Sequence, residues 1–279
     1  MNWLIWVVLY LIFYVIFNQG YKVTTKSLTK PGSLTILLEL IASIFSLLLI
    51  PFFEMRFPEN PLVYLFLGLS IIFYTITDRL NTTVRSGVEA STFSVINQLS
   101  TVFMIIAGVL FFKEPIIINK IIGAFLIVFS NVLIFFKKGN LKPNKYVILG
   151  IISNLCFSIA LFLDVNNSDY FNLPMYVATT LGVPIILIFI FEKIKFEDIK
   201  EEYRNGNKKA LWITAISWSL SIVAQLRAYQ LGEVSLIAPL CALILNVIVG
   251  YFFLKEKENL PKKIIAAILI ILGIVLIKV

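Results

Sequence analysis

The chain has 279 residues, of which 59% are hydrophobic and 14% charged, and its mean hydropathy is +0.93. A soluble domain needs a polar surface, so this composition excludes an ordinary soluble protein and predicts an integral membrane protein. The formal net charge is +8, but most basic residues stand in short segments between apolar runs, which indicates a topological bias and no nucleic-acid partner.

Ten apolar runs of membrane-spanning length follow one another along the chain, because a helix needs about 20 mostly apolar residues to cross the hydrocarbon core. They cover residues 3–19, 33–53, 61–79, 89–112, 115–136, 145–165, 172–192, 209–230, 233–254 and 261–278. The first run lacks a basic leading segment and a small-residue cleavage site, so we interpret it as a spanning helix rather than a cleaved signal. The longest connection, 193–208, is charged, and we expect at most an amphipathic surface turn there.

The two halves of the chain share landmarks that indicate an internal duplication. The fourth run opens with EAS at 89–91 and the ninth with EVS at 233–235, and each run is followed by a Lys-Glu pair, at 113–114 and 255–256. The runs that follow, 121–134 and 264–277, are identical at 8 of 14 positions without gaps.

Each half holds five expected spans, so the second half must enter the membrane from the opposite side. The sequence therefore predicts an all-α integral membrane protein with ten transmembrane helices, arranged as two inverted five-helix repeats at 1–139 and 140–279. Inverted repeats are a recurrent design of secondary transporters.

Residues 228–240, AYQLGEVSLIAPL, resemble the second-half signature of the drug/metabolite transporter superfamily, EamA type. The helix end at 253–256 (FLKE) and Gly273 fit the same pattern, and so do residues 112–114 (FKE) and Gly123 in the first half.

The sequence departs from the family in two places. Glu39 stands where members often carry arginine, and residues 98–100 (QLS) replace the proline-containing stretch that 238–240 retains. The resemblance implies a five-plus-five inverted fold around a central cavity. It also implies gradient- or exchange-driven movement of amino acids, other metabolites or drugs, often outward.

Polar and aromatic side chains on the predicted helices are candidates for a substrate cavity. Trp6, Tyr10, Tyr14 and Asn18 recur every four residues and share one helix face, which forms either a cavity wall or a packing surface. The other candidates lie on helices 3, 4, 6, 8 and 9: Tyr74, Thr77, Asn97, Gln98, Asn154, Ser158, Ser217, Trp218, Ser221, Gln225 and Asn246. Single hydroxyl groups often only join helices, but together these residues predict a wet interior.

Small residues seven apart mark helices 5 and 10, namely Gly123 and Ser130, and Ala266 and Gly273. This spacing predicts close helix packing rather than substrate contact.

The carboxylates need separate interpretations. Glu39 lies within helix 2 and either binds a cation or proton, snorkels to the interface, or pairs with a nearby lysine. Asp78 and Arg79 are expected at the end of helix 3, as a surface pair rather than a gate, and Asp164 is expected in solvent. Glu residues at helix boundaries, at positions 89, 114, 233 and 256, are interpreted as helix N-terminal groups.

Histidine is absent, and both cysteines, Cys156 and Cys241, stand within apolar runs. We therefore expect buried inert thiols, no metal site and no cofactor. The chain also lacks a G-x-x-x-x-G-K-[ST] phosphate loop, which argues against ATP hydrolysis.

The basic residues predict an orientation. Of the 24 lysine and arginine residues, 19 belong to loops 1–2, 3–4, 5–6, 7–8 and 9–10, which the positive-inside rule places in the cytoplasm. The abundance of Lys, Ile and Asn indicates a low-GC bacterium, so we expect a bacterial plasma membrane.

Together these observations predict a secondary transporter that moves a small metabolite, such as an amino acid, by alternating access. Its expected partners are a small-molecule substrate and the lipid bilayer, and we expect a monomer or weak dimer. The alternatives are a membrane-embedded enzyme acting on a lipid or isoprenoid, which usually carries carboxylate or histidine clusters, and a channel, which needs a repeated polar filter.

Overall fold

The structure is a computed structural model, and it describes residues 3–27, 30–100, 102–103, 106, 118–137, 140–141, 145–231, 243–255 and 260–278. The longer helices are α1 (Trp3–Thr24), α2 (Pro31–Leu48), α3 (Pro61–Gly87), α6 (Ile118–Phe135), α7 (Lys145–Asn167), α8 (Leu173–Phe191), α10 (Lys208–Leu231) and α13 (Leu260–Lys278). The shorter helices are α4 (Ala90–Asn97), α9 (Phe196–Asn205) and α12 (Leu243–Phe253), with 3-10 turns η1 (Thr25–Ser27), η2 (Ile50–Phe52) and η3 (Ser168–Tyr170). Two-residue strands, β1 (Phe136–Lys137) and β2 (Asn140–Leu141), pair antiparallel.

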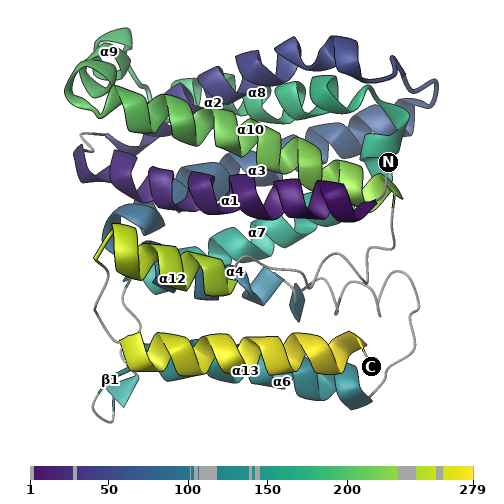
Figure 1. Ribbon diagram of the computed structural model, residues 1–279. Helices are drawn as coiled ribbons and strands as arrows, with labels where there is room; N and C mark the ends of the chain where they lie inside the picture. Colours follow the sequence, from purple (N-terminus) through teal and green to yellow (C-terminus); the bar gives the residue numbers. More distant parts are fainter. Residues whose placement is uncertain are drawn as a thin grey trace.

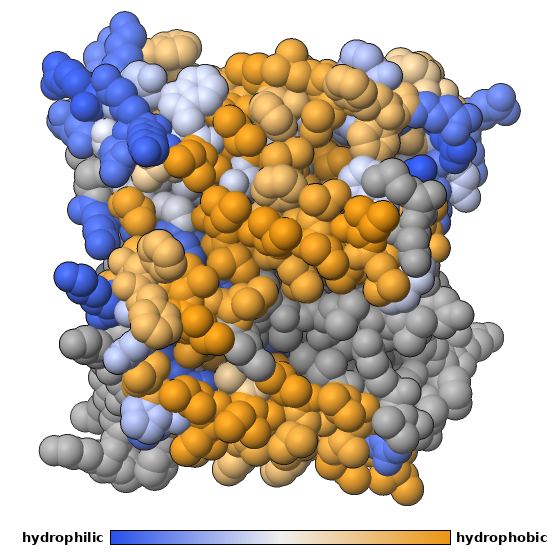
Figure 2. Space-filling model, viewed as in Figure 1, coloured by the Kyte–Doolittle hydropathy of each residue, from blue (hydrophilic) through white to orange (hydrophobic). Residues whose placement is uncertain are grey.

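Six helices of the described part are long and apolar enough to cross a membrane: α1, α2, α3, α7 together with η3, α8 and α10. Figure 2 shows a hydrophobic band across the visible face, with hydrophilic groups gathered at its two ends. On α1 the side chains of Leu4, Val8 and Ile12 are about half exposed, as lipid-facing residues are. The chain is thus a multi-pass membrane protein, and the count of ten crossings stays a prediction.

Local sequence explains where several helices begin. Pro31 and Pro61 open α2 and α3, at positions where a missing N–H leaves no helical hydrogen bond unmade. The Asn60 side chain accepts a 3.0 Å hydrogen bond from the backbone of Leu62, and Asn172 caps α8 in the same manner.

The main helix contacts join the first half of the chain to the second (Figure 1). The pairs are α1 with α10, α3 with α7, α2 with α8, α6 with α13 and α4 with α12. Further contacts join α2 with α10 and α3 with α8. The two halves are therefore interleaved rather than separate bundles.

The connections that follow the first, third, fifth and seventh predicted helices lie together at one end of the bundle, called here the odd-numbered end. Lys22, at the end of α1, donates a 2.7 Å hydrogen bond to the carbonyl of Arg85 near the end of α3. Lys30, just before α2, pairs with Asp198 of α9 at 2.6 Å. Gly87, at the end of α3, lies against the ring of Tyr146 at the start of α7.

The connections that follow the second and sixth predicted helices meet at the opposite, even-numbered end, where asparagine side chains hold them together. Asn172 donates to the carbonyls of Phe53 and Glu54, each at 3.1 Å. Asn167 donates to the carbonyl of Val63 at 3.0 Å. Figure 1 shows both chain ends at this end of the molecule.

A fourth contact at the odd-numbered end corrects the interpretation of Glu89. This residue is the N-cap of α4, but its side chain makes no capping hydrogen bond. It forms an ion pair with Lys263 of α13, whose side chain is buried. The Glu89 carboxylate therefore pairs with the buried ammonium group of Lys263 instead of capping the backbone N–H groups of α4. Glu114, Glu233 and Glu256 lie outside the described residues.

Two helix boundaries also differ from the prediction. Helix α3 continues through Gly87 rather than ending near 79, because its polar residues find partners: Thr82 shares hydrogen bonds with Tyr21 (2.6 Å) and Thr35 (2.5 Å). The connection 193–208, expected to form at most a turn, contains helix α9, whose first turn is fixed by a 3.0 Å hydrogen bond from the Lys195 backbone to Asp198.

The predicted close packing of helices 5 and 10 is confirmed by the contact of α6 with α13. A β-carbon added at Gly273 would lie 2.7 Å from the carbonyl oxygen of Gly123, so only glycine permits this approach. Ser130 and Ala266 are fully buried in the same region.

Candidate functional site

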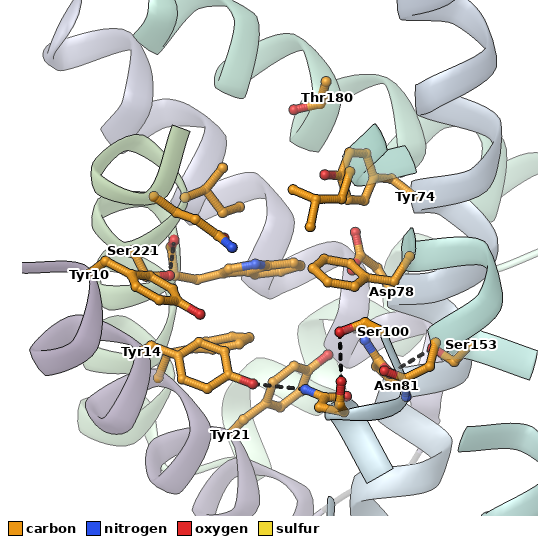
Figure 3. A pocket seen from close by; sticks show the side chains of 18 of the residues that line it. Tyr10, Tyr14, Tyr21, Tyr74, Asp78, Asn81, Ser100, Ser153, Thr180 and Ser221 are labelled. Carbon is orange, nitrogen blue, oxygen red and sulfur yellow. Dashed lines mark hydrogen bonds between the residues drawn. The ribbon is translucent and has the colours of Figure 1, made fainter. Parts of the chain in front are cut away.

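A cavity of about 130 Å³ lies inside the helix bundle and is lined by residues from both halves of the chain (Figure 3). Helices α1, α3 and α4 contribute from the first half, and α7, α8 and α10 from the second. A water molecule needs roughly 10–15 Å³ by this kind of measure, so the space suits several waters or a small organic molecule.

One wall of the cavity is aromatic. Tyr10 and Tyr14 of α1 have ring centroids 5.6 Å apart, and Asn97 donates a 2.8 Å hydrogen bond to the hydroxyl of Tyr14. Deeper in, Trp218 of α10 stacks on Phe17 with centroids 5.3 Å apart. These contacts fix flat apolar surfaces on the α1 and α10 side.

Two lining residues, Asp78 and Arg85, have ionisable side chains. Both belong to α3 and stand seven residues apart, which puts them on one face of the helix. Asp78 is 7% exposed and Arg85 is 2% exposed. The expectation that Asp78 belongs to a surface pair is therefore wrong, because α3 continues beyond it and carries it into the interior. Its predicted neighbour Arg79 instead pairs with Glu192 at the end of α8.

Arg85 is held by aromatic rings and one amide. Its guanidinium carbon lies 3.8 Å from the ring centre of Phe93, 4.7 Å from that of Tyr21 and 5.1 Å from that of Phe17. Its Nη1 donates to the backbone and side-chain oxygens of Asn18. Cation–π contacts of this kind stabilise a desolvated cation.

Polar contacts also join the cavity's α3 wall to α7. Ser153 of α7 donates a 2.7 Å hydrogen bond to the side-chain oxygen of Asn81, and Thr77 donates to the carbonyl of Ser153 at 3.3 Å. Figure 3 shows Asn81, Ser153 and Asp78 on the side opposite Tyr10 and Tyr14. The cavity therefore combines aromatic and polar side chains from several helices.

Asp164 lies beside the cavity and is buried, so the expectation that it is solvated is wrong. Its carboxylate accepts hydrogen bonds from Ser70 (2.5 Å), Tyr74 (2.7 Å) and Tyr176 (2.6 Å). Three hydroxyl donors compensate for burial of the acid, and they connect α3, α7 and α8. Tyr74 also lines the cavity, so this cluster supports one wall.

Glu39 is fully buried within α2, and neither carboxylate oxygen has a hydrogen-bond partner in the described part of the chain. It neither reaches the interface nor pairs with Lys22 or Lys30, which removes two of its three interpretations. Glu39 does not line the cavity, but it is an electrostatic neighbour of Asp78, which does.

The structure brings nine of the predicted cavity residues to this one space: Tyr10, Tyr14, Tyr74, Asn97, Gln98, Asn154, Trp218, Ser221 and Gln225. They come from five different helices and their immediate extensions. The periodic aromatic and polar residues of α1 and α10 account for most of this agreement.

Seven other predicted residues lie outside the lining: Trp6, Asn18, Glu39, Thr77, Ser158, Ser217 and Asn246. Trp6 packs against Phe53, with ring centroids 6.1 Å apart. Ser158 bonds back to the carbonyl of Asn154, and Asn246 accepts a hydrogen bond from Gln19. Ser217 is buried on α10. Most of these side chains support their own helix or a helix contact.

Arg85 is the main lining residue that the sequence interpretation missed. The sequence interpretation places Arg85 in loop 3–4 as a basic residue, because it predicts that helix 3 ends near residue 79. A signal was present, since Asp78 and Arg85 have the seven-residue spacing of one helix face. The spacing has this meaning only because α3 continues through the polar residues between Asp78 and Arg85.

Within the described residues, no group of three or more Asp, Glu, Cys or His side chains is placed to hold a metal ion. Cys156 is half-buried, and Cys241 lies outside the described residues.

Comparison with known proteins gives a family for the first half and a fold for the whole chain. Residues 1–136 match the model of the EamA-like transporter family. A solved structure described only as a crystal structure of a protein is 11% identical with a TM-score of 0.58, covering 97% of this chain and 95% of that one. This level of identity shows a shared fold alone. No curated protein matches the chain. The first 136 residues are thus similar to the EamA-like transporter family, which belongs to the drug/metabolite transporter superfamily.

Proposed function

We propose that the protein is a secondary transporter that moves a small metabolite, an amino acid or related compound, across the membrane by alternating access. The observation that carries this proposal is the polar and aromatic cavity within the bundle, which is lined by helices of both halves. A midplane site between two repeats is the arrangement that lets one binding site face each compartment in turn. Export is the direction that the family resemblance favours.

The helix pairs support two inverted repeats, 1–139 and 140–279. If the halves are superposed in chain order, α1 corresponds to α7 and α3 corresponds to α10. The contact of α1 with α10 then has a counterpart in the contact of α3 with α7, as a two-fold axis requires. Helix α2 likewise corresponds to α8, so the contact of α2 with α10 has its counterpart in the contact of α8 with α3.

Contacts join the two halves at both ends of the bundle. At the odd-numbered end, Arg79 of α3 pairs with Glu192 of α8, and Lys30 pairs with Asp198. At the other end Asn172 and Asn167 hold the connections. Alternating access would break one set of contacts while the other holds.

The basic residues support an orientation in which the odd-numbered connections face the cytoplasm of a bacterium and both chain ends face outside. Lysines 22 and 30 lie at the same end as the charged helix α9, so the bias gathers on one side of the molecule.

Uptake into proteoliposomes tests the transport function. The purified full chain is reconstituted, and uptake of individual radiolabelled amino acids is measured against protein-free vesicles. We expect saturable uptake of at least one of them. Non-saturable uptake equal to that of empty vesicles across amino acids, cations and nucleobases would contradict the proposal.

Single-cysteine labelling tests the inverted arrangement. In a background without Cys156 and Cys241, cysteines are placed at Lys26 and Lys200, in odd-numbered connections, and at Glu59, in an even-numbered one. A membrane-impermeant maleimide should label position 59 from the opposite side to positions 26 and 200. Labelling of all three from one side would reject the topology.

A further inference from the structure

Glu39 is a buried acid to which the described part of the chain offers no hydrogen-bond donor. Its side chain is fully buried in the middle of α2, and neither carboxylate oxygen has a partner among the described residues. Asp164, by contrast, is buried with three hydroxyl donors. An ionised carboxylate without a donor or a cation is very costly in a protein interior. Glu39 therefore requires a bound proton or a cation.

The packing of α2 on α3 places Asp78 opposite Glu39. The two helices run antiparallel, since α2 begins at the odd-numbered end, where α3 ends. The hydroxyls of Thr35 and Thr82 are 2.5 Å apart and fix the register of the two helices. One turn further toward the even-numbered end, α2 carries Glu39 and α3 carries Asp78, because four residues are about one helical turn. The two acids thus face each other across the contact and are electrostatic neighbours.

The groups next to this pair come from α1 and from α3 itself. Tyr21 of α1, whose hydroxyl is 2.6 Å from that of Thr82, is an electrostatic neighbour of both acids. On α3, Tyr74 and Arg85 are electrostatic neighbours of Asp78. Of these groups Arg85 alone is a cation, and it lies on the helix of Asp78 rather than on that of Glu39.

The other helices packed against α2 bring no cation to its middle. Helix α8 carries a single ionisable residue, Tyr176, whose hydroxyl donates to Asp164 of α7. Helix α10 begins with two exposed lysines, Lys208 and Lys209, and its other ionisable residues lie within its last five positions. Helix α9 packs against α2 near its start, where the buried Glu202 accepts a hydrogen bond from the backbone just before α2. The counter-charge of Glu39 must therefore come from outside these helices.

The buried charges around the cavity do not balance if every acid is ionised. Three buried carboxyl groups, those of Glu39, Asp78 and Asp164, lie in this region with one buried guanidinium, that of Arg85. The three hydroxyl donors stabilise a negative charge on Asp164, and Arg85 offsets one more. The pair of Glu39 and Asp78 is left with one negative charge in excess, which a single proton removes.

We propose that Glu39 and Asp78 form a proton-binding site in which the two carboxyl groups share one proton across the contact of α2 with α3. Two facing carboxylates repel each other strongly in a low-dielectric interior, so one proton removes both the repulsion and the excess charge. Asp78 is 7% exposed and lines the cavity, whereas Glu39 is 0% exposed, so the proton enters and leaves through Asp78 by way of the cavity. The site lies within the first half of the chain and does not depend on the transport function proposed above.

Occupancy of this site changes two features of the bundle. With the proton bound, a hydrogen bond between a carboxyl group and a carboxylate joins α2 to α3. Without it, two like charges face each other across the same contact and weaken it. The charge that Asp78 presents to the cavity changes at the same time, so proton binding links the pH to the cavity wall.

Infrared spectroscopy of the purified full chain in detergent tests the shared proton, since a protonated carboxyl group has a C=O stretching band that a carboxylate lacks. At neutral pH, where exposed carboxyl groups are ionised, we expect this band in the wild type. Glu39→Gln should lose the band, because Asp78 then keeps Arg85 as its counter-charge. Asp78→Asn should keep the band on Glu39 at a shifted frequency, because the partner of the bound proton has changed.

Asp164→Asn is the matched control, an acid-to-amide change in a buried acid that the proposal does not use. It should leave the band unchanged in position and size. Glu39→Gln breaks no hydrogen bond of the described residues, and every variant is recorded below its melting transition, so loss of the band is distinguished from loss of folding.

Each outcome either supports the site or overturns it. A wild type without the band, or a Glu39→Gln variant that retains it, overturns the proposal. An unshifted band in Asp78→Asn would assign the proton to Glu39 alone, which overturns the sharing. If sodium chloride in place of potassium chloride removes the wild-type band, the site binds sodium and the proton assignment is overturned. The measurement uses no solute and no gradient, so its result is separate from that of the uptake assay.

Discussion

The hydroxyl of Tyr74 donates a 2.7 Å hydrogen bond to the buried carboxylate of Asp164, so a residue of the cavity wall on α3 is held by an acid on α7. Asp164→Ala would leave the hydroxyls of Ser70, Tyr74 and Tyr176 without this acceptor, at a cost of about 1–3 kcal/mol for each group that stays unsatisfied. We expect a clearly lower melting temperature in detergent.

Asp164→Asn is the control for this cluster, because it keeps one acceptor oxygen and nearly the same volume. It should melt between the wild type and Asp164→Ala. If Asp164→Ala melts at the wild-type temperature, the three hydrogen bonds do not contribute to stability.

The approach of α6 to α13 at Gly273 gives a second prediction. Gly273→Ala places a β-carbon 2.7 Å from the Gly123 carbonyl, and overpacking of this kind costs about 1–3 kcal/mol. Gly68→Ala is the matched control, since nothing lies within 4 Å of its added carbon and alanine favours a helix by about 1 kcal/mol. Thermal unfolding should show a lower melting temperature for Gly273→Ala alone, and equal behaviour of the two variants would contradict close packing.

Tyr10 and Trp6 share a face of α1, but their surroundings predict different roles, substrate contact for Tyr10 and helix packing for Trp6. Tyr10 lines the cavity, whereas Trp6 packs against Phe53 and does not line it. Tyr10→Ala should reduce saturable uptake severalfold with little change in melting temperature. Trp6→Ala should lower the melting temperature more than the uptake per folded molecule. If Trp6→Ala reduced uptake and Tyr10→Ala mainly lowered the melting temperature, the substrate site would instead lie near the start of α1.

Glu39 has no hydrogen-bond partner among the described residues, so Glu39→Gln removes its ionisable group without breaking a hydrogen bond. We expect a folded protein whose uptake varies less with pH, because glutamine cannot exchange a proton next to Asp78. Uptake rates of both proteins are compared from mildly acidic to mildly alkaline pH. An unchanged profile would exclude a proton-carrying role.

At the odd-numbered end, the hydrogen bond from Lys30 lowers the pKa of Asp198 below its ordinary value. A lowered folded-state pKa gives stability above the unfolded-state pKa, about 3.9, which is lost as the pH falls through the folded value. Asp198→Asn should therefore melt slightly below wild type at neutral pH, and the difference should vanish in acid. A constant difference at all pH values would rule out this linkage.

The sequence by itself determined the class of protein and most of the helix positions. Runs of about 20 apolar residues leave no soluble alternative, and proline and asparagine mark where helices such as α2 and α8 begin. The four-residue spacing of Tyr10 and Tyr14 placed two cavity residues correctly on one face, because helical periodicity is a local property.

Tertiary structure alone decided which polar residues share the cavity and which only join helices. Asp78, Asp164 and Glu89 each look like boundary residues along the chain, yet Asp78 lines the cavity, Asp164 accepts hydrogen bonds from three hydroxyls of other helices, and Glu89 pairs with Lys263. Burial and hydrogen bonding depend on neighbours that are distant in sequence, so only the continuation of α3 through Gly87 places both Asp78 and Arg85 in the cavity lining.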